Sequence, residues 1–209
     1  GSLPNRRPTT LDLDNSGTSL RLLTTLALLC QFPVTLTGSA RMQERPIGPL
    51  AGALPALGGT VEFLQKDGYP PLRVSGNLLG GPVVIDGSMS SQFISSILMA
   101  APYAEKEVEV IIPAPPASAS YLDITLSVME DFGAKVERTG YERFVVSTAD
   151  RYKARRYTVE GDYSSASYFF ALAAICSGKV TVMNLAPASV QGDRRFLDAL
   201  QEMGCTVTY

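Results

Sequence analysis

The sequence predicts an α/β fold made of repeated βαβαββ units, two complete or nearly complete and a third one truncated. Three stretches share a pattern in which a short strand, an acidic turn with small residues and a pair of hydroxyl side chains precede an apolar helix. The stretches lie 72 and 74 residues apart, anchored at Thr18, Ser90 and Ser164. Further strands and helices follow each stretch in the same order, so the repeat is the basis of the fold prediction.

The first two units are predicted in full. The first unit begins with a strand and a helix at 11–29. A strand at 34–38 and a helix at 45–54 follow, and two paired strands at 60–65 and 72–76 complete the unit. In the second unit, the corresponding segments are 83–101, 107–112, 120–133, 135–140 and 143–148. Alternating apolar and polar residues predict the strands, and apolar residues every three to four positions predict the helices.

The third unit supplies part of this pattern. It is expected to begin with a strand and a helix at 157–175. A strand at 179–184, a helix at 192–204 and a last strand at 206–209 follow. The chain reaches Tyr209 before any partner for that last strand, and a lone strand leaves its backbone groups unpaired. We therefore expect the chain to be a piece of a longer protein.

Glycines and a proline mark the second helix of each unit. Gly58, Gly133 and Gly204 follow these helices, where a left-handed residue commonly ends a helix. Pro55 lies at the end of the second helix of the first unit, where proline removes a hydrogen bond and kinks the helix. We expect left-handed closure at the three glycines and a distortion at Pro55.

The composition excludes several classes of protein. Hydrophobic residues make up 45% of the 209 residues and charged residues 18%, as in ordered globular proteins, and the net charge is −2. Without a basic surface, neither nucleic acid nor a membrane is an expected partner. The chain has no histidine, which removes the commonest general base and most zinc sites. Its three well-separated cysteines, Cys30, Cys176 and Cys205, indicate reduced thiols in a cytoplasmic protein.

The starts of the first helices are candidate anion sites. A helix N-terminus exposes unpaired N–H groups and the positive end of the helix dipole. Gly17 lets the backbone approach a ligand, and Thr18, Ser90 and Ser91 add hydroxyl donors. Helix capping alone explains the same residue types. We interpret Ser164–Ser165 in the third unit as a cap.

Two arginines and an amide favour an anion site in the first two units. Arg21 lies one turn into the first helix, Arg45 precedes the second helix, and Gln92 follows the two serines. Arginine binds carboxylate or phosphate through two parallel hydrogen bonds, although a surface ion pair with Asp or Glu explains each arginine equally well. The residues themselves therefore predict a repeated α/β protein whose helix starts face a small anionic ligand.

The second helix of the second unit also begins with polar residues. Ser118 and Tyr121 flank its start, and Ser120 with Asp123 matches a capping box. A tyrosine in such a helix is more often part of a core than a platform for a ligand. No carboxylate–lysine pair stands out here or elsewhere as an acid–base pair.

Six motifs in order across residues 11–209 extend this interpretation. They are DNSGTSLRLL, RMQERPIGPL, DGSMSSQFISSILM, SYLDITLSVMEDFG, VEGDYSSASYFFALAAI and QGDRRFLDALQEMG. Together they resemble the 5-enolpyruvylshikimate-3-phosphate synthase family, the 3-phosphoshikimate 1-carboxyvinyltransferases. The related UDP-N-acetylglucosamine enolpyruvyl transferases share the βαβαββ architecture, but DGSMSSQF and YLDITL favour the shikimate enzymes.

The resemblance implies a partial enolpyruvyl transferase fold and a transferase of the shikimate pathway of aromatic amino acid biosynthesis. The implied reaction moves the enolpyruvyl group of phosphoenolpyruvate to the 5-hydroxyl of shikimate 3-phosphate and releases phosphate, by addition and then elimination. It uses no metal and no organic cofactor. The ligands would bind between two closing domains, each built from three βαβαββ units.

The resemblance also implies which residues bind the two substrates. The residues expected to bind shikimate 3-phosphate are Ser90, Ser91, Gln92, Ser118 and Tyr121, the last against its ring. Phosphoenolpyruvate would contact Gly17, Arg45 and Gln92, in a pocket shaped by Asn15, Thr18 and Arg21.

The resemblance implies a central fragment that holds no catalytic residue. The family's N-terminal lysine, serine and arginine ligands, its later acid–base aspartate, glutamate and lysine, and its C-terminal arginines have no counterpart here. Residues 3–158 would supply two units of the first domain, and residues 159–209 would supply a truncated unit of the opposing domain. Gly1 and Ser2 resemble a cloning remnant and are left out of both. The remainder of the same polypeptide is then a partner, and we expect negligible turnover by this chain alone. The alternative is a noncatalytic anion-binding or scaffolding module of the same fold.

Overall fold

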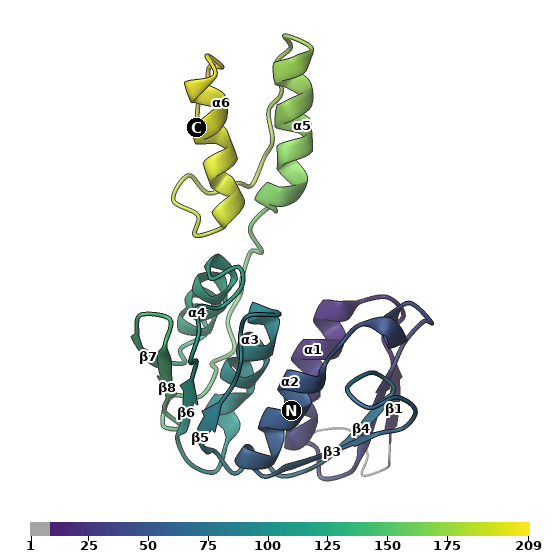
Figure 1. Cartoon of the computed structure of the whole chain (residues 1–209). Helices are drawn as coiled ribbons and strands as arrows, with labels where there is room; N and C mark the ends of the chain where they lie inside the picture. The colour runs from purple at the N-terminus through teal and green to yellow at the C-terminus, as the bar shows by residue number, and fades with distance from the viewer. Residues whose placement is uncertain (1–8) are drawn as a thin grey trace. The chain divides into compact units, whose positions relative to one another are not determined.

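The computed structural model of the chain describes residues 9–209 (Figure 1). The chain divides into two compact units, Gly1–Lys153 and Ala154–Tyr209. The predicted cloning remnant and the first residues of the segment expected to begin at residue 3 lie outside the described residues. Both complete repeats belong to the first unit, and the truncated repeat belongs to the second.

The first repeat has the predicted order of strands and helices. Its strands are β1 (Thr9–Asp12), β2 (Val34–Thr37), β3 (Gly59–Phe63) and β4 (Leu72–Gly76). Its helices are α1 (Gly17–Leu26) and α2 (Gly48–Ala53), with 3-10 turns η1 (Ala27–Leu29), η2 (Met42–Glu44) and η3 (Leu54–Leu57). The βαβαββ prediction is confirmed for this repeat.

The second repeat follows the same order. Its strands are β5 (Gly81–Val84), β6 (Val108–Ile111), β7 (Val136–Thr139) and β8 (Arg143–Val146). Its helices are α3 (Ser91–Ala100), continued by the 3-10 turn η4 (Ala101–Tyr103), and α4 (Ser120–Asp131). The prediction of a second complete unit is therefore confirmed.

Each repeat forms a four-stranded mixed sheet, and the two sheets have the same topology. The strand orders are β1-β2-β4-β3 and β5-β6-β8-β7. β1 and β2 are parallel, as are β5 and β6, while the other pairs are antiparallel. A parallel pair needs a long crossover connection, and α1 and α3 supply it. The starts of α1 and α3 therefore follow the first strand of each sheet.

The two repeats share one hydrophobic core. Alternate residues of the central strands are buried, as with Val34 and Leu36 in β2 and Val108 and Val110 in β6. α1 and α3 pack side by side, and the strands of the two sheets lie outside them (Figure 1). The relative positions of these helix starts are thus set inside a single compact unit.

The helix-ending glycines and the proline distortion are confirmed. Gly58, Gly133 and Gly204 all have φ of +93°, the left-handed conformation predicted for them. At Pro55 the α-helical geometry has already ended, because α2 stops at Ala53 and the chain continues as η3. Proline cannot donate the hydrogen bond that α-helical geometry requires, which accounts for the change.

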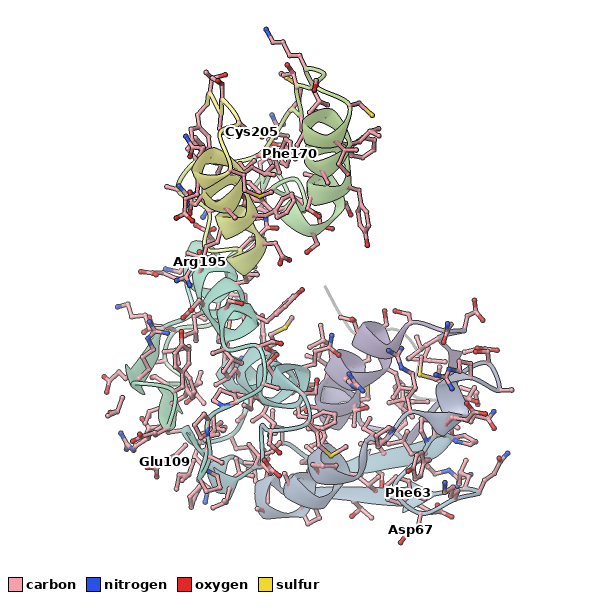
Figure 2. The ribbon with its side chains drawn as sticks, turned by 45° about the horizontal axis from the view of Figure 1, so that its top comes forward. Phe63, Asp67, Glu109, Phe170, Arg195 and Cys205 are labelled. Atoms are coloured by element: carbon pink, nitrogen blue, oxygen red, sulfur yellow. The ribbon has the colours of Figure 1, made fainter. Side chains whose placement is uncertain are left out.

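The second unit consists of two helices joined by irregular segments. The helices are α5 (Tyr163–Ile175) and α6 (Arg195–Glu202), the latter preceded by the 3-10 turn η5 (Gly192–Arg194). Phe170 and Cys205 lie between the two helices (Figure 2) and pack against a small buried cluster of Tyr163, Leu197 and Leu200. Across residues 9–209, no helix has both the length and the apolar character needed to cross a bilayer.

The strands predicted in the third repeat are wrong for this structure. The segments 157–161, 179–184 and 206–209 are irregular. The first two approach each other at Asn184, whose carbonyl accepts the Gly161 N–H (2.7 Å) and whose side-chain amide donates to the Val159 carbonyl (2.9 Å). A strand forms only when neighbouring backbone completes its hydrogen-bond ladder, and an alternating sequence cannot supply that ladder by itself.

The interpretation of Ser164 and Ser165 as caps is also wrong. The cap of α5 is Asp162, whose carboxylate accepts the N–H groups of Ser164 (3.0 Å) and Ser165 (3.1 Å). The serines are therefore the capped residues. A carboxylate at this position is a charged acceptor beside the positive end of the helix dipole, and so it binds these N–H groups more strongly than a hydroxyl.

The three repeat anchors are not equivalent in the structure. The connection before α3 covers 85–90 and is two residues longer than the connection 13–16 before α1. As a result, Ser90 is the N-cap of α3, whereas Thr18 is the second helical residue of α1. Sequence spacing alone aligned these residues because both connections end in hydroxyl side chains.

Replacing Gly133 by alanine tests the left-handed helix end. The nearest atom to an added Cβ is 3.5 Å away in the Lys153 side chain, so the strain comes from φ rather than from overlap. We expect Gly133→Ala to lower the free energy of unfolding in urea by about 1–2 kcal/mol. The matched control is Gly52→Ala, which lies inside α2 with no atom within 4 Å of an added Cβ and should not destabilise. Equal losses in both variants would contradict the explanation.

The cap of α5 predicts a pH dependence. A hydrogen bond from the Ser165 hydroxyl, and then bonds from the backbone N–H groups of Ser164 and Ser165, lower the pKa of the Asp162 carboxyl from its ordinary 3.8. Because the folded pKa is the lower one, the stabilisation is complete above the ordinary value and is lost as pH falls through the folded pKa. We expect amide-exchange protection of α5 to decline below about pH 4. Asp162→Asn, which caps without titrating, should show no such decline.

Candidate functional site

Three helix starts in the first unit carry all the predicted binding residues except Arg45. These residues lie at 15–21, at 90–92 and at 118–121, where α1, α3 and α4 begin, and Arg45 precedes α2. All of them belong to the unit Gly1–Lys153. Their geometry is therefore defined within one compact body.

The start of α1 leaves a backbone donor open. Ser16 is its N-cap, since the Ser16 hydroxyl accepts the Ser19 N–H (3.3 Å) and donates to the Ser19 hydroxyl (2.7 Å). The Gly17 N–H donates to the Asn15 carbonyl (3.1 Å), and the Asn15 side chain is exposed. Among the partners available in residues 9–209, none accepts the Thr18 N–H. The helix start therefore keeps a donor for a ligand.

Arg45 covers the backbone of Gly17. A Cβ added at Gly17 would overlap Nη1 of Arg45 and lie 2.9 Å from its Cζ, so any larger residue would displace the guanidinium. Arg45 itself is exposed, and within residues 9–209 it makes no ion pair and no side-chain hydrogen bond. The surface ion pair considered for Arg45 is therefore not formed in the part of the chain that the structure describes.

Arg21 is bound to the second repeat. Its Nη1 donates to Oε1 of Gln92 (2.8 Å) and to the Ser90 hydroxyl (3.3 Å). Its Cζ lies 5.2 Å from the centroid of the Phe93 ring, in a cation–π contact that the sequence interpretation missed. Burial, and then the nearby charge of Arg45, lower the pKa of the Arg21 guanidinium. An ion pair between Arg21 and a carboxylate, the alternative interpretation, does not occur in the described structure.

Gln92 joins the starts of α1 and α3. Its Oε1 accepts from Arg21, and its Nε2 donates to the Thr18 hydroxyl (3.0 Å). The Ser90 hydroxyl accepts from Arg21 and from the Gln92 N–H (3.3 Å). Because a hydroxyl has one proton of its own, Thr18 and Ser90 accept these bonds and can still donate to an anion.

The start of α4 lies beside the start of α3. The Ala117 N–H donates to the Gly87 carbonyl (2.9 Å), which joins the two preceding connections. Ser118 has a left-handed φ of +53° and is exposed, whereas Ser91 is 4% exposed. Tyr121 is 49% exposed, so the expectation that this tyrosine belongs to the core is wrong.

The capping box predicted at Ser120 and Asp123 is not formed. α4 has no side-chain cap, and Ser120 is already its first helical residue. Asp123 accepts instead from the Tyr141 hydroxyl (2.6 Å) and from Nη1 of Arg138 (2.5 Å). A hydrogen bond to a guanidinium is stronger than one to a neutral N–H, so the contact with the β7–β8 hairpin prevails over the local cap.

The site combines two guanidinium groups with hydroxyl and backbone donors. Arg45 is its exposed cation, Arg21 is its half-buried cation, and Thr18 and Ser90 supply hydroxyl protons. In residues 9–209, no group of three acidic or cysteine side chains is placed to hold a metal ion. This chemistry suits a small anion such as a phosphate ester or a carboxylate.

The family model for EPSP synthase, 3-phosphoshikimate 1-carboxyvinyltransferase, matches residues 1–209. The chain belongs to this family. The match confirms the resemblance seen in the six motifs. It also agrees with the anion-binding chemistry of the helix starts.

Curated relatives are named 3-phosphoshikimate 1-carboxyvinyltransferase. The protein of Methanoregula boonei is 66% identical over 209 residues, which are 100% of this chain and 50% of the relative. The protein of Erwinia tasmaniensis is 46% identical over 210 residues, covering 100% of this chain and 49% of the relative. The chain spans about half the length of the curated relatives it matches.

Solved structures of the family show the same fold. The EPSP synthase of Acinetobacter baumannii superposes with a TM-score of 0.76 at 26% identity, covering 94% of this chain and 43% of that one. Together with the names of the relatives, this likeness supports the shikimate enzyme over its UDP-N-acetylglucosamine relative. The enolpyruvyl transferase fold, present in part, is thereby confirmed.

Removing the charge of Arg45 tests the electrostatics of the ligand-free site. Arg45 is near enough to Arg21 for its charge to lower the pKa of the Arg21 guanidinium. We therefore expect Arg45→Gln to raise the free energy of unfolding at low salt by roughly 0.2–1 kcal/mol, measured by urea denaturation. Arg41→Gln is the matched control, because Arg41 pairs with Glu44 (2.6 Å) and its loss should not stabilise. If both variants behave alike, the two guanidinium groups do not repel each other measurably.

Proposed function

We propose that this chain forms part of an enzyme that transfers the enolpyruvyl group of phosphoenolpyruvate to the 5-hydroxyl of shikimate 3-phosphate and releases phosphate. The observation that carries the proposal is the exposed Arg45 guanidinium over the backbone of Gly17, without a counter-ion among residues 9–209. The family and the names of the relatives support phosphoenolpyruvate and shikimate 3-phosphate as the anions. The chain would act by binding and orienting both substrates.

The start of α1 is the proposed site for phosphoenolpyruvate. Gly17, Arg45 and Gln92 would contact it, and Asn15, Thr18 and Arg21 would shape the pocket. Arg45 can present two parallel N–H groups to a carboxylate or a phosphate, and the Thr18 N–H and hydroxyl lie at the same helix start. Gly17 has no side chain to keep an anion away from Arg45.

The starts of α3 and α4 are the proposed site for shikimate 3-phosphate. The residues assigned to it are Ser90, Ser91, Gln92, Ser118 and Tyr121. Ser90 has a hydroxyl proton to donate, and the exposed Tyr121 ring can lie against the cyclohexene ring of shikimate. Because Gln92 bonds to both Arg21 and Thr18, it would lie between the two substrates.

We propose negligible turnover by the chain alone. Addition and elimination require proton transfer and converging charges in a site that excludes water. The residues of this chain assigned to the substrates supply hydroxyl, amide, guanidinium and backbone groups, which bind and orient but do not serve as an acid–base pair near neutral pH. The acid and base would come from the remainder of the same polypeptide.

We also propose that residues 3–158 belong to one domain of the parent enzyme and 159–209 to the opposing domain. The division of the described chain near Lys153 supports this assignment. The second unit also exposes an apolar surface on α5, with Tyr168 78%, Leu172 59% and Ile175 81% accessible. Burial of that surface by the remainder of the polypeptide would stabilise this unit.

The proposed compartment is the cytoplasm. All three cysteines, Cys30, Cys176 and Cys205, are free thiols in the structure. Burial raises the pKa of the Cys30 thiol, which makes it less reactive. Free thiols are typical of proteins in a reducing compartment.

Calorimetric titration with shikimate 3-phosphate tests the binding part of the proposal. We expect saturable binding in the millimolar range, and Gln92→Ala should weaken it by about tenfold through the lost amide contacts. Gln31→Ala is the control, because Gln31 is exposed and lies outside the site. Absence of a saturable response at millimolar ligand would refute binding. Equal affinity for inorganic phosphate would instead favour a noncatalytic anion-binding module.

A further inference from the structure

Two adjacent serines are buried in the middle of α3. Ser95 is 5% exposed and Ser96 is 0% exposed, in a helix whose other central residues are apolar. A buried hydroxyl lowers stability unless it is hydrogen-bonded, so each of these serines needs a partner. Adjacent helical residues point about 100° apart. The two serines can therefore reach different neighbouring helices.

Ser96 reaches α1. Its hydroxyl donates to the Arg21 carbonyl (2.7 Å) and lies 2.7 Å from the Thr25 hydroxyl, which is fully buried. Ser96 donates its one hydroxyl proton to the Arg21 carbonyl, with the Leu22 carbonyl as a longer second acceptor (3.3 Å), so Thr25 is the donor to Ser96. The chain of hydrogen bonds runs from Thr25 to Ser96 to the backbone of Arg21.

Ser95 reaches α4. Its hydroxyl lies 2.8 Å from the Thr125 hydroxyl, and the Thr125 hydroxyl donates to the Tyr121 carbonyl (2.8 Å). Since Thr125 donates its single hydroxyl proton to that carbonyl, Ser95 is the donor to Thr125. The second chain runs from Ser95 to Thr125 to the backbone of Tyr121.

Both chains end on backbone carbonyls of residues in the candidate site. One ends at Arg21, which contacts Ser90 and Gln92, and the other ends at Tyr121. The helix that holds both serines begins at Ser91. α3 is thus joined to α1 through the buried Ser96 and Thr25, and to α4 through the buried Ser95 and the partly buried Thr125.

We propose that Ser95 and Ser96 are positioning residues that set the spacing between the two substrate subsites. Ser96 would place the α1 start, which binds phosphoenolpyruvate, and Ser95 acting through Thr125 would place Tyr121 against shikimate 3-phosphate. This inference rests on the function proposed above for the same site. It adds that the geometry of each subsite depends on a different hydroxyl of α3.

A merely structural role makes a different prediction. If the hydroxyls only stabilise the core, removal of either one lowers stability and leaves ligand affinity unaltered in the protein that remains folded. If they position the subsites, loss of a hydroxyl that donates to a backbone carbonyl of the site weakens the binding of one ligand and not of the other. Thr125→Val and Thr25→Val separate the two cases, because both are nearly isosteric and each removes one hydroxyl of these chains, the partly buried one at Thr125 or the fully buried one at Thr25.

The first measurement is the affinity of the chain for shikimate 3-phosphate, from an NMR titration. Thr125→Val removes the bond to the Tyr121 carbonyl, and we expect it to weaken binding by about threefold to tenfold. Thr25→Val leaves the bond from Ser96 to Arg21 in place and should change affinity by less than about twofold. Equal weakening in both variants, or no weakening in either, would overturn the proposal.

The second measurement needs no ligand and is independent of the proposed function. The carbonyl ¹³C shift of Tyr121 reports the hydrogen bonds that its oxygen accepts, as does that of Arg21. We expect Thr125→Val to move the Tyr121 signal and not that of Arg21, and Ser96→Ala to move the signals of Arg21 and Leu22 and not that of Tyr121. If wild type fails to bind shikimate 3-phosphate, the proposed function and the positioning role both lose their support, and these shifts then decide only whether the two hydrogen-bond chains exist. Unmoved carbonyl signals in both variants would refute the positioning role.

Discussion

The side-by-side packing of α1 and α3 is the constraint on which the first unit depends. α1 belongs to the first repeat and α3 to the second, so this contact joins two similar halves around one core. Thr25 and Ser96 meet in its interior at 2.7 Å. At the helix starts, Arg21 bonds to Gln92 across the same interface. Because the interface contains both buried hydroxyls and residues of the candidate site, a change in its packing would also change the geometry of the candidate site.

This packing also decides the distribution of charge in the site. Arg21 donates to Ser90 and Gln92 and lies over Phe93, so part of its hydrogen-bonding capacity is used within the protein. Arg45 has no such partner among residues 9–209 and remains available. An anion bound between them would remove the repulsion between two guanidinium groups, which favours its binding. The site therefore combines one arginine that orders the protein with one that is open to ligand.

The second unit shows what the same repeat becomes without a sheet. α5 and α6 form, since helices satisfy their backbone groups internally, whereas the strand-like segments around them remain irregular. Their apolar residues, and those of α5 such as Ile175, remain accessible. The contrast with the first unit indicates that the βαβαββ pattern gains its stability from packing between layers rather than from local preference.

Much of the fold followed from the sequence by itself, because its signals are local. The two complete repeats, the left-handed ends at Gly58, Gly133 and Gly204, and the grouping of donors at helix starts all depend on residues close in the chain. The tertiary structure decided the rest. It showed that Arg21 hydrogen-bonds to the second repeat and that Asp123 accepts from Arg138 instead of forming the predicted capping box. It also showed that the third repeat, residues 157–209, contains no strand. Each of these depends on a partner distant in sequence, and spacing along a chain carries no information about which distant group completes a hydrogen bond.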